Sequence, residues 1–231
     1  MRVIQILFLL VISAVMAVGA ESAVVRFRAV SCLGAVPTEM YYKSKDNQYE
    51  LIITYPESRS PFYNIYYSSQ AIGLYQKTND PKAGKDGYNQ IGTVDIKGKG
   101  HTPLLLFLPD KNAPLGITAR AMRDDADSVP AGSYHFVNLT TRPILVAMNK
   151  SGLSIPPGGD VITPPPNDNK NINVVMGVSY EGSTKLLYTN VWGREDKITT
   201  LVLIYANPEA NNAFCASRII DYPSTWKPQS K

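Results

Sequence analysis

The sequence has 231 residues, with 23 Lys and Arg against 19 Asp and Glu, and a formal net charge of +4. So small a charge says little about partners, but no Lys/Arg cluster is long enough to indicate a nucleic-acid-binding surface, so no nucleic-acid partner is expected. After the first 20 residues, no apolar stretch is long enough to span a membrane.

The N-terminus has the pattern of a cleaved secretory signal peptide. Met1-Arg2 supplies a short positive region, an almost unbroken apolar run covers 3–18, and Val18-Gly19-Ala20 offers small residues to a signal peptidase. We predict that residues 1–20 are removed and that the mature chain begins near Glu21. A membrane anchor is the alternative, but the apolar run is slightly short for one. The mature protein is therefore expected to be secreted or periplasmic.

The mature chain has the pattern of a succession of short strands. Segments rich in Val, Ile, Leu, Tyr and Thr are separated by turn residues, and 17 prolines and 16 glycines interrupt any helical period. The stretch 156–170, with prolines at 164–166, is expected to be extended and exposed. In chain order, the predicted strands cover 24–32, 39–43, 49–55, 62–67, 71–76, 90–96, 103–108, 115–122, 132–139, 144–148, 172–178, 185–192, 199–206 and 213–220.

This pattern predicts an all-β protein built as an antiparallel β-sandwich. The length suits two Ig-like sandwiches in tandem, over 24–109 and 114–222, followed by a loose tail at 223–231. One larger sandwich is the alternative.

A weak internal repeat favours construction from similar units. Apolar strands that contain Leu51, Leu104 and Tyr205 each run into a proline followed by an acidic residue, then three residues, then a new strand. The pattern is short, and chance similarity is the alternative.

Four segments carry a resemblance to a known family. Together they resemble a family of uncharacterised secreted bacterial proteins, over most of the mature chain. The resemblance implies an extracytoplasmic compartment and a β fold, and it implies no site. The segments are Val25-Arg26-Phe27-Arg28-Ala29-Val30, Ser60-Pro61, Pro130-Ala131-Gly132-Ser133-Tyr134-His135-Phe136-Val137-Asn138-Leu139 and Arg142-Pro143-Ile144.

A second, shorter resemblance lies within one of these segments. The motif that runs from Pro130 through Gly132 to Tyr134 is similar to the Pro-x-Gly-x-Tyr motif with which prealbumin-like sandwich domains begin. It implies that a sandwich domain starts there.

The two cysteines, Cys32 and Cys215, form an even pair in a chain predicted to be exported. Such a pair favours one disulfide bond. Closing so long a loop would contribute roughly 5 kcal/mol in the chain-entropy model. Two buried free thiols are the alternative.

The residues needed for catalysis are largely missing. His101 and His135 are the only histidines, and no H-E-x-x-H, G-x-S-x-G or E-x-D-x-E pattern accompanies them. We therefore predict a non-catalytic binding or structural protein that needs no cofactor. The alternative is an extracellular hydrolase of polysaccharide or peptide, whose carboxylates would come from distant turns.

One acidic cluster is a candidate metal site. Asp124, Asp125 and Asp127 place three carboxylates within four residues, and carboxylate oxygens are ligands for calcium. The spacing matches no complete loop motif, so a solvated turn is the alternative.

Tyrosines indicate where a ligand would bind. Eight of the 14 tyrosines lie between positions 41 and 75, and their rings offer broad contact area with a polar tip. A glycan, or a protein of the envelope or extracellular space, is the expected partner. Ordinary strand preference for Tyr is the alternative explanation. The predicted contact residues are Tyr55, Phe62, Tyr63, Tyr66 and Tyr67.

Overall fold

The computed structural model describes residues 24–66, 70–79, 86–165, 171–180, 183–206 and 214–223. Within these ranges the chain is all-β, as predicted, with 16 strands and one short 3-10 turn, η1 (Pro114–Gly116). None of the described segments forms a helix long and apolar enough to cross a membrane. The predicted leader at 1–20 and nearly all of the predicted tail at 223–231 lie outside the described residues.

The first sandwich pairs two four-stranded sheets. One sheet has the order β4-β1-β7-β8, and the other has the order β3-β2-β5-β6. Its strands are β1 (Val24–Ser31), β2 (Met40–Lys43), β3 (Tyr49–Leu51), β4 (Tyr63–Tyr66), β5 (Ala71–Lys77), β6 (Tyr88–Asp95), β7 (Leu104–Pro109) and β8 (Ile117–Met122).

The second sandwich is built in the same way. Its sheets have the orders β12-β9-β15-β16 and β11-β10-β13-β14. Its strands are β9 (Tyr134–Asn138), β10 (Ile144–Met148), β11 (Ser151–Ile155), β12 (Asp160–Thr163), β13 (Asn171–Tyr180), β14 (Ser183–Gly193), β15 (Thr199–Ala206) and β16 (Phe214–Asp221).

The two sandwiches share one strand order, because adding eight to each strand number converts the first into the second. Even the parallel pair recurs: β1 lies parallel to β7, and β9 lies parallel to β15. In an immunoglobulin domain the first strand pairs with the second, so the order found here differs from it. The Pro130–Tyr134 motif leads into β9, the first strand of the second sandwich.

The division between the sandwiches lies later in the chain than predicted. The expected boundary at 109–114 falls inside the hairpin that joins β7 to β8, where Leu104 pairs with Met122 and Pro109 with Ile117. Ala121 is buried in the core of the first sandwich. The chain therefore changes sandwich between Met122 and Tyr134, because the proline at 109 ends a strand and not a domain.

Two strands were missing from the sequence prediction. The segments that form β11 and β12 contain Ser, Gly and Asp, and prolines flank both of them. Each pairs along one side only, β11 with β10 and β12 with β9. The stretch 156–170, expected to be irregular, thus contains an edge strand, because ladder pairing at an edge tolerates a weak local strand pattern.

Alternating side chains build a separate core in each sandwich. In β2, Met40 and Tyr42 are buried while Tyr41 and Lys43 face outward. The first core gathers around Phe27 and the second around Trp192, the largest fully buried side chain.

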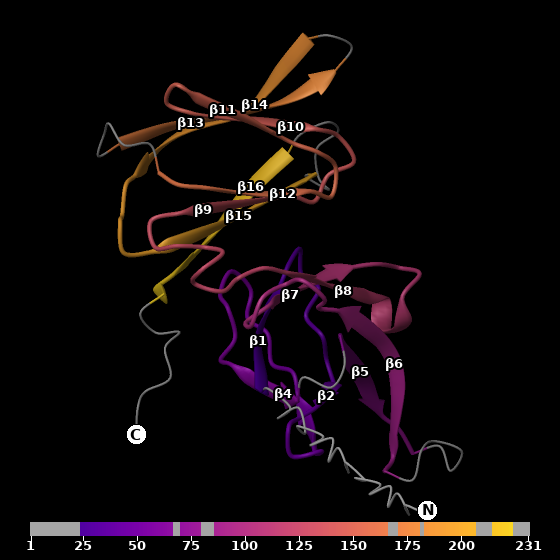
Figure 1. Ribbon diagram of the computed structural model, residues 1–231. Coiled ribbons are helices and arrows are strands. Elements are labelled where there is room, and N and C mark those ends of the chain that lie inside the picture. Colours follow the sequence, from indigo (N-terminus) through magenta and orange to yellow (C-terminus); the bar gives the residue numbers. More distant parts are fainter. Residues whose placement is uncertain are drawn as a thin grey trace, which may run out of the picture.

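A third apolar cluster joins the two sandwiches. The β1–β7–β8 face contributes Val30, Leu106 and Met122, and the β9–β15–β16 face contributes Leu203 and Ile219. The inner sheets therefore pack face to face, and the β3-β2-β5-β6 and β11-β10-β13-β14 sheets lie at opposite ends of the molecule (Figure 1).

Candidate functional site

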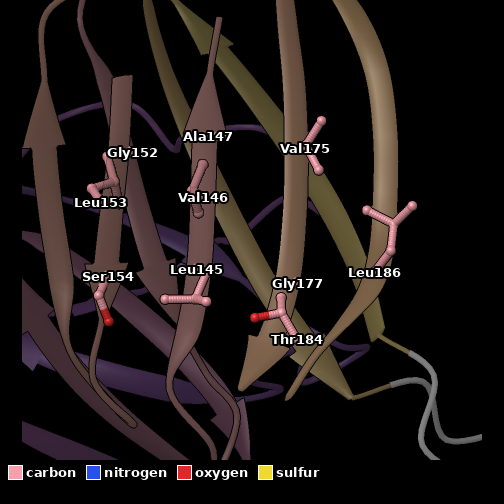
Figure 2. Close-up of a pocket in the computed structure, with 10 residues that line it drawn as sticks. All are labelled: Leu145, Val146, Ala147, Gly152, Leu153, Ser154, Val175, Gly177, Thr184 and Leu186. Atoms are coloured by element: carbon pink, nitrogen blue, oxygen red, sulfur yellow. The ribbon is translucent and has the colours of Figure 1, made fainter. Parts of the chain in front are cut away.

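An apolar hollow of about 460 Å³ opens on the outer face of the β11-β10-β13-β14 sheet. Figure 2 shows that its lining residues come from all four strands of this sheet. We call this site the hollow. Its lining residues are Leu145, Val146, Ala147, Gly152, Leu153, Ser154, Val175, Gly177, Thr184 and Leu186.

Around the hollow, Leu145, Val175 and Leu186 are apolar residues at outward positions, where a solvated sheet face normally carries polar residues. Leu186 is 60% exposed and Val175 is 37% exposed, and Leu145 pairs with Gly177 in the middle of the sheet. The hydroxyls of Ser154 and Thr184 are the polar side-chain groups of the hollow. None of the described lining residues has a titratable side chain, so this site can bind but offers no acid–base chemistry.

The two glycines of the hollow differ in the space above them. No heavy atom lies within 4 Å of the point where a Cβ on Gly152 would lie. Gly177 is different, because a Cβ there would come within 2.8 Å of Cγ2 of Thr184. A side chain at Gly152 would thus project into open space, whereas one at Gly177 would displace Thr184.

The corresponding outer face of the first sandwich is filled by tyrosines. Tyr49 stacks on Tyr88 with ring centroids 4.0 Å apart, and it meets Tyr75 edge-on at 5.0 Å. Tyr41 packs edge-on against Tyr88 at 5.0 Å, and the Lys43 ammonium lies 5.5 Å from the Tyr49 ring. Tyr41, Tyr49, Tyr75 and Tyr88 are called the tyrosine cluster below.

Burial and a charged neighbour also shift the pKa of one member of this cluster, Tyr49. Desolvation, followed by the charge of Asp86, raises the pKa of Tyr49 above its ordinary value. A hydrogen bond between the Tyr49 hydroxyl and the Asp86 carboxylate adds to this rise, because it favours the protonated hydroxyl. The tyrosine cluster is therefore a packed group of rings.

A second cavity, of about 490 Å³, lies where the two sandwiches meet. It brings together two of the predicted contact residues, Tyr55 and Phe62, with Arg28, Arg59 and Asp221. Tyr55 is 44% exposed, and the Phe62 ring has the Arg28 guanidinium 5.0 Å from its centroid.

The remaining predicted contact residues do not join them. Tyr63 packs against the first core, where its hydroxyl donates to the Ile53 carbonyl at 2.9 Å and accepts from the Ile53 amide at 2.9 Å. Tyr66 ends β4, but its side chain lies outside the described part of the structure, as does all of Tyr67.

The charges beside the second cavity are already paired. Asp124 accepts from Nη2 of Arg28 at 2.6 Å and receives Nε and Nη2 of Arg59 at 3.0 and 2.9 Å. Arg28 also pairs with Asp221, and so crosses from the first sandwich to the second. Because the guanidiniums hold both carboxylates, the arrangement serves to fix the two sandwiches together.

The predicted calcium site is not formed. Asp124 is 1% exposed and faces the two arginines, whereas Asp127 is exposed. Asp125 accepts from the Ser128 amide and hydroxyl, each at 2.9 Å, and closes a turn. Across the described ranges no group of three His, Cys, Asp or Glu side chains is placed to hold a metal. The three carboxylates are adjacent in sequence, but the strand end directs them to different sides.

The predicted Cys32–Cys215 bond is also absent, and both residues are free thiols. Cys32 follows β1 in the first sandwich, where its amide donates to the Phe107 carbonyl at 2.9 Å. Cys215 is held opposite Tyr205 in the second sandwich. Each ladder fixes its own cysteine, and burial raises the pKa of the Cys32 thiol to about 12.

His135, expected to be an ordinary packed residue, is fully buried between the sandwiches. Its Nε2 lies 2.9 Å from Oδ2 of Asp160, and Oδ1 of Asp160 lies 3.4 Å from Nη2 of Arg120 in the first sandwich. The hydrogen bond with His135 lowers the pKa of Asp160, although desolvation opposes the shift. This trio is a second polar link across the interface.

The fold and the hollow together define a two-sandwich β protein with an apolar site on one outer sheet. No protein-family model matches the chain. No curated protein is significantly similar to it in sequence.

Proposed function

We propose that this is an exported, non-catalytic protein that acts by binding an apolar ligand in the hollow. Export rests on the leader pattern at 1–20. Binding rests on one observation above all: outward-facing apolar side chains from β10, β13 and β14, together with Gly152 of β11, surround an open space of about 460 Å³.

The size and chemistry of the hollow support this role. Small-molecule sites commonly have volumes of roughly 300–1,000 Å³, with apolar walls and a few polar groups that orient the ligand. Leu186, at 60% exposed, stays in contact with water when the site is empty. Covering Leu186 and Val175 would remove apolar surface from water, at roughly 25 cal/mol for each Å².

The competing proposal, a hydrolase, has less support. The hollow has no titratable lining residue among those described, and the carboxylates of the second cavity are tied to Arg28 and Arg59. A general acid or base must be free to exchange a proton with a substrate. Binding is therefore the function that these contacts favour.

A dye titration tests the proposal. The mature protein is titrated with anilinonaphthalene sulfonate, and we expect a saturable rise in fluorescence. Gly152→Tyr places a ring in the open space and should weaken binding at least about tenfold. Gly193→Tyr is the matched control, because Gly193 belongs to β14 of the same sheet, does not line the hollow and also has open space around it. A rise that Gly152→Tyr leaves unchanged, or no saturable rise, would overturn the proposal.

A further inference from the structure

The ladder registers of the two outer sheets correspond residue by residue. Tyr41 of β2 lies opposite Tyr75 of β5, and Leu145 of β10 lies opposite Gly177 of β13. The register shifts between Leu74 and Tyr75 in the first sandwich and between Met176 and Gly177 in the second. The shared bulge fixes the alignment, so that Tyr75 corresponds to Gly177 and Tyr41 to Leu145.

The same alignment places the rest of the tyrosine cluster. In the first sandwich Tyr49 lies opposite Lys43, two residues beyond Tyr41, and in the second Gly152 lies opposite Ala147, two residues beyond Leu145. Tyr49 therefore corresponds to Gly152.

The fourth tyrosine is placed by the outermost strand. Tyr88 lies opposite Lys77, two residues beyond Tyr75, and Thr184 lies opposite Ser179, two residues beyond Gly177. Tyr88 therefore corresponds to Thr184.

All four positions that carry the tyrosine cluster in the first sandwich line the hollow in the second. Their residues there are Leu145, Gly152, Gly177 and Thr184. The hollow is thus the space that aromatic rings occupy on the sister sheet.

The first sandwich also shows how a ring sits on this face. Atoms of the Tyr75 ring lie 2.7–2.9 Å from the point where a Cβ on Gly73 would be, so the ring covers bare glycine backbone. Gly152 is a glycine on an edge strand with no such cover. An aromatic ring laid over an edge glycine is a recognised way to stabilise a sheet.

From this correspondence we infer that the hollow binds a small molecule with a planar aromatic ring, which lies across Leu145 and Gly177, between Gly152 on one edge strand of the sheet and Leu186 on the other. The ring takes the place that Tyr49 and Tyr88 fill in the first sandwich. The Ser154 and Thr184 hydroxyls can hydrogen-bond to a polar substituent on the ring. This inference rests on the proposed binding function and names the ligand class.

Two probes of matched size but different ring character test the inference. Naphthol and decahydronaphthol are each titrated into the mature protein by calorimetry, with methyl NMR of Leu145, Val175 and Leu186 as a second readout. We expect naphthol to bind at least about fivefold more tightly and to shift these methyl signals through its ring current.

Two variants locate the site. Gly152→Tyr should abolish the naphthol shifts, and Gly193→Tyr should retain them. Should Gly152→Tyr fail to fold, Leu186→Asn removes a wall residue that is 60% exposed and should weaken naphthol binding at least about fivefold. Equal affinity for the two probes would overturn the aromatic class while leaving the binding function standing. If neither probe binds the wild-type protein, or if neither Gly152→Tyr nor Leu186→Asn weakens naphthol binding, both the aromatic class and the binding function would be overturned.

Discussion

Tyr75 and Gly177 occupy the same position in the two sandwiches, each directly after a register shift and each opposite the outward residue of the neighbouring strand. One carries a ring that covers a glycine, and the other carries no side chain at all. This difference, together with those at the three other tyrosine positions, shows how one fold yields a filled face and an open one.

Replacement of Tyr49 by Ala should destabilise the first sandwich by about 1–2 kcal/mol, because the Tyr49 ring contacts both Tyr75 and Tyr88. Urea unfolding measures the change. Tyr55→Ala is the control, since Tyr55 is 44% exposed and its loss should cost less than about 0.5 kcal/mol. Tyr55→Ala should also leave dye binding unaltered. If Tyr55→Ala weakened dye binding, the second cavity and not the hollow would be the binding site.

Asp124→Ala should lower the free energy of unfolding by about 3–5 kcal/mol, because it leaves the buried guanidiniums of Arg28 and Arg59 to share the single carboxylate of Asp221. Asp125→Ala removes only the bonds to Ser128 and should cost about 1 kcal/mol. Calcium or a chelator should leave the unfolding temperature of the wild-type protein unchanged. A rise in that temperature with calcium would revive a metal site at Asp124, Asp125 and Asp127.

Acid should weaken the link between the sandwiches at Asp160. Its pKa in the folded protein is lowered by the hydrogen bond with His135, so the charged form is favoured by folding. The resulting stability is fully present above the ordinary carboxyl pKa of about 3.9 and is lost as the pH falls through the lower folded pKa. Unfolding of Asp160→Asn and wild type should therefore differ at pH 6 and converge in strong acid. The exposed Asp127→Asn should follow the wild type throughout, and a constant difference for Asp160→Asn at every pH would contradict the linkage.

The two cysteines should titrate as free thiols in protein unfolded without reductant. In the native state a thiol reagent should reach the half-buried Cys215 first, because Cys32 is 3% exposed and its pKa is raised to about 12. Cys215→Ser should remove the fast phase. A thiol count of zero in the unfolded protein would establish the bond that export favours.

The predicted export has its own measurement. Mass spectrometry of material recovered outside the cytoplasm should show a chain that starts within a few residues of Glu21. Ala20→Leu, which places a large residue at the cleavage position, should yield a longer, membrane-retained product. A wild-type chain that keeps residues 1–20 would contradict the prediction that this leader is cleaved.

Most strands could be predicted from the sequence because their signal is local. Val25 and Phe27 alternate with Arg26 and Arg28, and that alternation is sufficient to indicate β1. The strands β11 and β12 lack such a signal, since β11 is rich in Ser and Gly and β12 is a four-residue segment between prolines; pairing with β10 and β9 supplies what the local sequence does not. Of the suspected repeat, the units at Leu104 and Tyr205 belong to equivalent hairpins, β7–β8 and β15–β16, while Leu51 belongs to a different one.

The hollow could not be predicted, because it depends on register and not on residue type. Gly152 and Gly177 are ordinary glycines in sequence, and they become a site only when the ladder aligns them with Tyr49 and Tyr75. The Arg28–Asp124 pair was hidden for a similar reason, because 96 residues separate its members. The one available signal was that Leu145 and Val175, at outward positions of β10 and β13, are apolar.

The packing of the inner sheets gives the protein two different outer faces on opposite sides. The cluster around Val30 and Leu203 and the Arg28–Asp221 pair hold the two sandwiches end to end, so the outer sheets face away from each other (Figure 1). A molecule bound in the hollow is exposed on the β11-β10-β13-β14 sheet, and the tyrosine cluster covers the outer face of the β3-β2-β5-β6 sheet. A ligand bound in the hollow is therefore separated by both sandwiches from any partner that contacts the tyrosine cluster.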